Sequence, residues 1–133
     1  MGLKIKLNAI MVSDQDKALK FYTEVLGFVK GKDIPVGGPY RWLTVISPDG
    51  HPDVELVLEP NANPVGRTFQ EGLFKQGIPA TAFEVDDIQA EFQRLKAQGV
   101  VFTMEPSRMG AVTLAVFADT CGNLIQMYQQ ASA

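Results

Sequence analysis

Residues 12–28 read VSDQDKALKFYTEVLGF, and this stretch combines the end of a strand, a helix and a glycine stop. Asp14 stands at the expected N-cap, because a short carboxylate accepts hydrogen bonds from the free N–H groups of a first helical turn. Gly27 predicts the helix end, since glycine readily adopts the left-handed conformation of a C-terminal cap. The apolar residues between them follow helical spacing and predict one buried stripe: Ala18, Phe21, Tyr22, Val25 and Leu26.

Four strands are predicted around this helix. Imperfect alternation of apolar residues makes 5–12 a strand with both faces at least partly covered. Strand-like runs follow at 28–36, 40–46 and 54–59, and the Pro48-Asp49-Gly50 turn predicts that the last two pair as a hairpin. The first half therefore has the order strand, helix, strand, strand, strand.

The second half repeats this order. A strand at 78–85 leads into a helix that is capped by Asp86 or Asp87 and ends at Gly99. Strands are predicted to start at 100–102 and to run over 111–117 and 124–128, with residues 104–110 interrupting the first of them. The buried stripe of this second helix is formed by Ile88, Phe92 and Leu95.

The repeat has a measurable period. Asp14 lies over Asp87 at an offset of 73 residues, and Val45 lies over Val116 at an offset of 71. A long internal period indicates two copies of one supersecondary unit. Two βαβββ modules would each carry a curved sheet with one helix outside, and a cleft between modules is a usual place for a small ligand.

Residues 60–67 have the composition of a linker between the halves. Thr68-Phe69-Gln70-Glu71 then matches a capping box, in which the threonine and the glutamate satisfy each other's N–H groups. We therefore predict a short helix that starts at Thr68 and ends before Gly77.

Composition excludes several classes of function. The 133 residues suffice for one compact domain, and a net charge of -3 without any basic cluster argues against nucleic-acid binding. The N-terminus lacks the apolar run of a signal peptide, and no segment is apolar over the thickness of a bilayer. One cysteine, Cys121, cannot form an internal disulfide. We therefore expect a cytoplasmic protein without nucleic-acid or membrane partners.

The layout resembles the vicinal oxygen chelate superfamily, which includes glyoxalase I, bleomycin-resistance proteins and extradiol dioxygenases. The residues that carry the resemblance are 14–28, Glu55-Leu56 and the Asp119-x-x-Gly122-Asn123 turn. The resemblance implies an α+β, glyoxalase-like fold with curved mixed sheets around a cleft. It implies a single domain over 1–133, with module one at about 3–60, a linker and short helix at 61–77, and module two at about 78–130.

Metal-dependent members hold a divalent ion through side chains on the first and fourth strands of each module. Carried over by position, these sites fall on Leu7, Glu55, Ala80 and Gln126. Leucine and alanine have no donor atom, and one carboxylate with one amide is a weak set for a divalent ion. The site is therefore predicted to be degenerate, with no resident metal and no cofactor.

Three hypotheses for the role of Glu55 are open. It is a general base, as the matching carboxylate is in proton-transferring relatives, or it binds a polar group of a ligand, or it is a structural hydrogen-bond partner of Gln126. A base needs a raised pKa and a group that stabilises the enolate it creates. With the metal ligands missing, no supplier of that stabilisation is visible in the sequence.

Strand alternation from these positions gives the full set of predicted ligand-binding residues. Trp42 and Tyr128 suit stacking on a planar ligand, although aromatic residues at strand spacing are more often core. Arg41 and Arg108 suit an anionic group or lie as exposed charges, and His51 is interpreted as a solvated loop residue. As a nucleophile Cys121 would need a basic residue nearby, and His51, the one histidine of the sequence, lies in another turn-like segment. The predicted set is Leu7, Ala9, Met11, Trp42, Glu55, Val57, Ala80, Ala82, Gln126 and Tyr128.

The resemblance and these residues together predict a bleomycin-resistance-like homodimer that binds a small organic molecule in an apolar, metal-free cleft. One alternative is a lyase or isomerase of glyoxalase I type, with Glu55 as base and a divalent metal recruited through other ligands. A second alternative is a structural or regulatory dimer whose cleft is filled by side chains.

Overall fold

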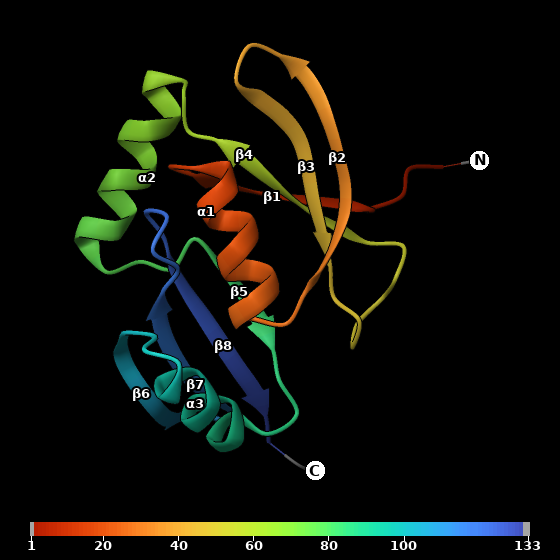
Figure 1. The fold of residues 1–133 in the computed structure, drawn as a ribbon. Helices are drawn as coiled ribbons and strands as arrows, with labels where there is room; N and C mark the ends of the chain where they lie inside the picture. The colour runs from red at the N-terminus through yellow and green to blue at the C-terminus, as the bar shows by residue number, and fades with distance from the viewer. Residues whose placement is uncertain (1, 132–133) are drawn as a thin grey trace. The chain divides into compact units, whose positions relative to one another are not determined.

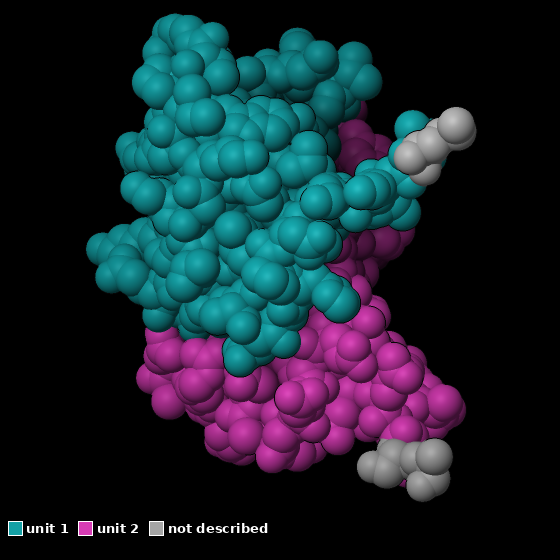
Figure 2. Space-filling view, turned by 90° about the vertical axis from the view of Figure 1, so that its right-hand side faces the viewer, with its two compact units in different colours: residues 1–67 teal, residues 68–133 magenta. Residues whose placement is uncertain are grey.

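The structure is a computed structural model that describes residues 2–131 of the chain. The chain divides into two compact units, Met1–Arg67 and Thr68–Ala133, which Figure 2 shows in separate colours. Each unit contains its own four-stranded sheet. In the described part of the chain, every helix is too short or too polar to cross a bilayer.

The first unit forms the predicted βαβββ module. Its sheet has the order β1-β4-β3-β2, with β1 parallel to β4 and the other neighbours antiparallel. Helix α1 continues directly into a π-helical turn and contacts β3 and β4 (Figure 1). The elements are β1 (Leu7–Val12), α1 (Gln15–Lys20), the π-helical turn (Phe21–Val25), β2 (Val29–Gly37), β3 (Tyr40–Ile46) and β4 (Glu55–Pro60).

The second unit repeats this topology. Its sheet has the order β5-β8-β7-β6, again with one parallel pair, β5 with β8. Helix α3 packs on β6, β7 and β8. The elements are β5 (Thr81–Glu84), α3 (Ile88–Ala97), β6 (Phe102–Met109), β7 (Val112–Ala118) and β8 (Leu124–Gln130), and the boundary between the units falls inside α2 (Pro64–Gln76). The predicted α+β fold of two βαβββ modules is confirmed.

Both helix caps form as the sequence predicts. Asp14 Oδ1 accepts a hydrogen bond from the N–H of Lys17 at 3.0 Å, and Asp87 Oδ1 accepts one from Ala90 at 3.1 Å. Asp87 is therefore the cap of the second helix, in place of its neighbour Asp86. Gly27 ends the first helical segment at a φ of 88°, in the left-handed region where a side chain is strained.

Each unit has a core between its helix and one face of its sheet. In the first unit the helical stripe buries Ala18, Phe21 and Tyr22, while Val25 and Leu26 are half-buried. In the second unit the predicted stripe is fully buried, and the ring of Phe92 meets that of Phe102 at 4.7 Å. The sheet residues that complete the two cores are Ile10, Val12, Leu43, Val45, Leu56 and Leu58 in the first unit and Ala115, Phe117, Ile125 and Met127 in the second.

The start of helix α2 differs from the prediction. The helix begins at Pro64, four residues before Thr68, and runs for 13 residues. Asn63 Oδ1 accepts a hydrogen bond from the N–H of Val65 at 2.9 Å, and a proline in the first helical position has no N–H to satisfy. The Asn63-Pro64 start therefore takes precedence over the capping box, and the second half of the predicted linker is helical.

Strand β6 also differs from the prediction. It continues from Phe102 to Met109 without the interruption expected at 104–110, and it pairs with β7 along this length. The register shifts between Phe102 and Met104 and again between Met104 and Ser107. These irregularities accommodate Pro106 inside a paired strand, because a bulge releases the ladder hydrogen bond that proline cannot make.

Candidate functional site

The sheet face opposite α1 carries the predicted ligand-binding residues of the first unit. Leu7 lies directly beside Glu55 and Ala9 beside Val57, because β1 and β4 pair in this register. Leu7 is 50% exposed and Ala9 is exposed, whereas Val57 is buried. Trp42 stands on the same face, two residues before Thr44 of β3, and is 36% exposed.

Met11 lies at the covered end of this face. It is half-buried, and a Cβ placed on Gly66 would lie only 2.7 Å from the Met11 Sδ atom. The first turn of α2 therefore packs closely against this side chain. Glycine at 66 permits that approach.

In the second unit, the parallel pairing brings Gln126 beside Ala82 and Tyr128 beside Glu84. Ala80 precedes β5, and its N–H donates to the carbonyl oxygen of Leu124 at 2.8 Å. Ala80 and Ala82 are exposed, and Gln126 and Tyr128 are half-buried. The direct neighbour of Gln126 is thus Ala82, whereas the direct neighbour of Glu55 in the first unit is Leu7.

Glu55 belongs to a polar group that we call the Glu55 cluster, formed by Lys32, Thr44 and Glu55. The Thr44 hydroxyl donates to Glu55 Oε1 at 2.6 Å, and the Lys32 ammonium donates to Glu55 Oε2 at 3.2 Å. The backbone N–H of Lys32 donates to Thr44 Oγ1 at 2.8 Å, which directs the threonine proton toward the carboxylate. The hydrogen bond from Thr44 lowers the pKa of Glu55 below its ordinary value; burial opposes this shift, and Lys32 reinforces it.

Sequence reasoning missed the other two members of this cluster and the glycine that admits them. A Cβ on Gly31 would lie 2.4 Å from Thr44 Oγ1 and 3.2 Å from Glu55 Oε1, so only glycine fits above the cluster. The pairing of β2 with β3 shifts register between Lys30 and Asp33, which marks a bulge at this point. A glycine inside the strand-like run 28–36 was the available signal, because glycine in a strand interior often marks a bulge or a close approach.

The surroundings of Glu55 bear on two chemical roles, general-base catalysis and the binding of a metal ion. A general base that works near neutral pH benefits from a raised pKa, and the pKa of Glu55 is lowered. Among residues 2–131, no group of three or more histidine, cysteine, aspartate or glutamate side chains is arranged to hold a metal ion. Taken unit by unit, the first has a carboxylate at 55 beside the aliphatic residue at 7, and the second has an amide at 126 and an aliphatic residue at 80; neither pair alone fits the donor needs of a divalent ion.

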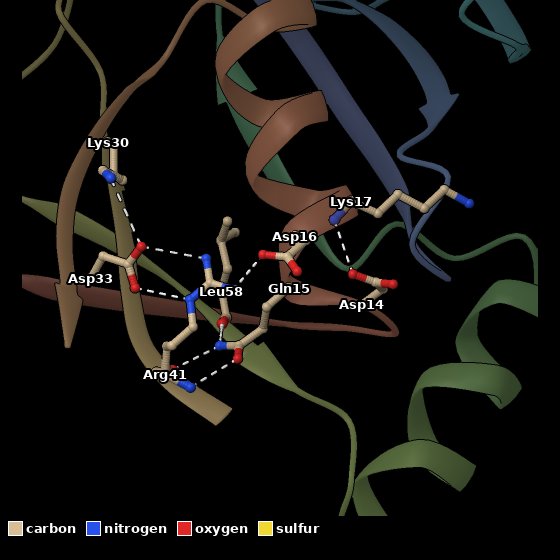
Figure 3. Close-up of polar contacts among 8 residues, drawn as sticks. All are labelled: Asp14, Gln15, Asp16, Lys17, Lys30, Asp33, Arg41 and Leu58. Atoms are coloured by element: carbon tan, nitrogen blue, oxygen red, sulfur yellow. Dashed lines mark hydrogen bonds and ion pairs between the residues drawn. The ribbon is translucent and has the colours of Figure 1, made fainter. Parts of the chain in front are cut away.

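Arg41 joins α1 to the edge of the sheet (Figure 3). Its guanidinium forms ion pairs with Asp16 of α1 and with Asp33 of β2, the latter at 2.9 Å from Nε to Oδ1. Lys30 adds a longer ion pair to Asp33 at 3.8 Å. The hydrogen bond from Arg41 lowers the pKa of Asp33, and the Asp33 and Asp16 hydrogen bonds raise the pKa of Arg41. Arg41 thus lies in an internal charge network.

Gln15 fixes the backbone beside Trp42. Its side-chain Nε2 donates to the carbonyl oxygens of Arg41 at 2.7 Å and Leu58 at 2.9 Å, and its Oε1 accepts from the N–H of Arg41 at 3.0 Å (Figure 3). Gln15 is buried, so these bonds are shielded from water. The first turn of α1 is therefore bonded to both β3 and β4.

The remaining candidates lie apart from these faces. His51 is exposed in the β3–β4 turn, and Arg108 donates through Nε to the carbonyl oxygen of Gly110 at 3.2 Å. Cys121 is fully buried in the turn before β8, where Asp119 Oδ1 accepts from its N–H at 2.7 Å. A buried thiol is inaccessible to a substrate.

Comparison with known proteins gives a consistent result over nearly the whole chain. YurT, an uncharacterised protein of Bacillus subtilis (strain 168), is 55% identical over 128 residues, which cover 96% of this chain and 100% of that protein. The crystal structure of UcmS2 is 35% identical, with a TM-score of 0.81 and coverage of 96% of this chain and 98% of that one. The structure of TnmS3, an antibiotic binding protein from Streptomyces sp. CB03234, is 30% identical, with a TM-score of 0.77 and coverage of 98% and 99%.

A family model matches residues 4–127, a range that runs from before β1 into β8 and contains nine of the ten predicted ligand-binding positions, all except Tyr128. Topology, helix caps and sequence similarity therefore agree, and the chain belongs to the Glyoxalase/Bleomycin resistance protein/Dioxygenase superfamily.

Proposed function

We propose that this protein binds a small organic molecule through the exposed faces of its sheets, without a resident metal ion. The observation that carries the proposal is the chemistry at the four family metal positions. Leu7 and Ala80 offer no donor atom, and both oxygens of the Glu55 carboxylate accept hydrogen bonds from the protein's own Thr44 and Lys32. The similarity to TnmS3 supports a ligand of antibiotic type.

The face residues suit such a ligand. Leu7, Ala9 and Ala82 are small or aliphatic and exposed, and Trp42 presents an aromatic surface. Aromatic rings bind planar ligands by stacking, and a few polar groups then fix the orientation. Gln126, Tyr128 and the Glu55 cluster would supply those polar groups.

The first test is ligand-dependent stability. We expect bleomycin, or another member of a panel of aromatic antibiotics, to raise the melting temperature, since a ligand present at 100 times its Kd adds about 2.7 kcal/mol. Trp42 is the single tryptophan, so its fluorescence reports binding at the first unit's face. If no member of the panel changes the melting temperature or the fluorescence, the alternative of a structural or regulatory protein whose cleft is filled by side chains is favoured.

A pair of matched variants locates the binding face. Ala82→Arg places a long charged side chain on the exposed face beside Gln126, and Ala90→Arg places the same side chain on an exposed position of α3. We expect Ala82→Arg to weaken binding of the stabilising compound at least tenfold, about 1.4 kcal/mol, while Ala90→Arg leaves it unchanged. Equal affinities of the two variants would contradict the proposed location.

A second test concerns the metal. Calorimetric titration of protein purified without chelators should detect no stoichiometric binding of Ni²⁺, Zn²⁺ or Mn²⁺. Tight binding of one ion per chain would favour the glyoxalase-type lyase or isomerase, in which Glu55 serves as base. In that case Glu55→Gln should abolish turnover.

We also propose that the chain works as a homodimer, as the family resemblance implies, and that it does so in the cytoplasm, as the composition of the sequence suggests. The sequence has one cysteine, Cys121, which is buried and cannot form a disulfide within the chain, and this agrees with a reducing compartment. Light scattering coupled to size-exclusion chromatography measures the mass of the assembly, and a mass of about one chain at micromolar concentration would contradict the dimer.

A further inference from the structure

The β2 bulge places two hydrogen-bond donors of Lys32 in the Glu55 cluster. Gly31 and Lys32 lie where the register with β3 shifts, and Lys32 uses both its backbone N–H and its side-chain ammonium there. The N–H reaches Thr44 Oγ1, and Thr44 in turn donates to Glu55 Oε1. Both oxygens of Glu55 therefore already have a donor within 3.2 Å.

The Glu55 carboxylate needs a positive charge nearby. Its side chain is 16% exposed, and an ionised carboxylate that is largely removed from water is costly unless it is paired and hydrogen-bonded. The Lys32 ammonium supplies that charge from a side chain that is itself 56% exposed. Lys32 thus enters from the solvent side and covers Glu55 Oε2.

Leu7 completes the arrangement on the other side. It is the direct Cα partner of Glu55 across the β1–β4 pair, and its side chain offers no lone pair. A cation that approached Glu55 from β1 would find an aliphatic neighbour, and one that approached from β2 would meet the Lys32 ammonium.

We propose that Lys32 is a built-in counter-ion that substitutes for a divalent cation at Glu55, and that the Gly31–Lys32 bulge exists to place it there. Lys32 therefore does more than stabilise the sheet, because it competes directly with any metal ion for the carboxylate. The proposal does not depend on the identity of an organic ligand.

The test adds a metal-binding side chain beside Glu55 and then removes the Lys32 ammonium that would compete with the metal. Leu7→His places an imidazole beside Glu55, and Lys32→Gln removes the ammonium charge while it keeps a hydrogen-bond donor. Zn²⁺ is titrated calorimetrically into the wild type, the Leu7→His variant and the Leu7→His/Lys32→Gln variant, with no organic ligand present. We expect the double variant to bind Zn²⁺ at least tenfold more tightly than Leu7→His alone.

A matched control separates the local effect from the change in net charge. Lys30 lies on the same strand and pairs with Asp33, so Leu7→His/Lys30→Gln should bind Zn²⁺ as Leu7→His does. Lys32→Met serves as a second charge-removing variant if Lys32→Gln fails to fold, with thermal unfolding as the check on folding. Co²⁺ absorption gives an independent signature of ligation by the new imidazole.

Two results would overturn the inference. One is equal Zn²⁺ affinity with and without the Lys32 ammonium, and the other is the absence of Zn²⁺ binding in the double variant. Because the titrations contain metal alone, either result leaves the small-molecule function to be judged by its own experiment.

Discussion

At the scale of single residues, Gly31 is the position that determines the Glu55 cluster. The left-handed conformation is not the reason for glycine here, since its φ lies outside that region. The reason is space, because a Cβ would meet the Thr44 hydroxyl at 2.4 Å. Real side chains do not approach so closely, so any larger residue must displace Thr44, Glu55 or the strand itself.

Gly31→Ala is therefore expected to destabilise the protein by about 1–3 kcal/mol, the usual cost of inserting a methyl group into a packed site. Urea unfolding measures the change. Gly72→Ala is the matched control, because nothing lies within 4 Å of its added Cβ and the position is helical. That control should be neutral or stabilising by up to about 1 kcal/mol, since alanine is the better helix former. Equal effects of the two substitutions would contradict the steric account.

At the scale of elements, α1 is fixed to its sheet by polar contacts as well as by its apolar stripe. Gln15 bonds to the backbones of β3 and β4, and Asp16 pairs with Arg41 of β3. Asp33 of β2 pairs with the same guanidinium (Figure 3). Three elements of the first unit thus meet at Arg41, beside the exposed Trp42.

This network predicts a pH-dependent contribution to stability. The hydrogen bond from Arg41 lowers the pKa of Asp33 from its ordinary value of 3.8. A depressed folded-state pKa means that the folded chain binds fewer protons than the unfolded chain, so the contribution is present above pH 3.8 and is lost as the pH falls through the folded pKa.

Asp33→Asn should therefore lower the melting temperature at pH 7, and the difference from the wild type should disappear in acid. Thermal unfolding between pH 7 and pH 2 measures both parts of the expectation. Asp86→Asn is the control, because that exposed residue does not cap the helix beside it. A constant difference between Asp33→Asn and wild type over the whole range would rule out the charge network as its cause.

At the scale of the whole molecule, the two units use one structural plan. Asp14 caps α1 and Asp87 caps α3, each by accepting a hydrogen bond from the N–H three residues later, at 3.0 and 3.1 Å. The parallel pair at one edge of each sheet and the antiparallel hairpins beside it also recur. Equivalent positions should consequently have equivalent energetic roles.

We expect Asp14→Ala and Asp87→Ala each to cost about 0.5–2 kcal/mol, because each leaves a first-turn N–H without its side-chain acceptor. Asp86→Ala, one residue from the second cap, should cost much less. Chemical denaturation of the three variants measures the values. If one cap substitution lowered the free energy of unfolding strongly and the other did not, the two caps would not have equivalent energetic roles.

The two βαβββ modules were predictable from the sequence, because the signals for them are local. Asp14, Asp87, Gly27 and Gly99 act on the helical turn to which they belong, and the apolar stripes follow from the helical period alone. The start of α2 at Pro64 was not predicted, although its signal is equally local. Asn63-Pro64 and the capping box at Thr68 are both helix-start signals, and the sequence alone does not show which of them is used.

The residues that meet on the sheet faces were not predictable from the sequence, because they come together only when the strands pair. Lys32, Thr44 and Glu55 come from three different strands, and their contact depends on a bulge that shifts the register between β2 and β3. The pairing of Gln126 with Ala82, rather than Ala80, likewise follows from the register of β5 with β8. Strand register is set by the fit of whole strands against each other, and a shift of one residue turns every side chain to the opposite face. The composition and spacing of one segment therefore do not determine its register.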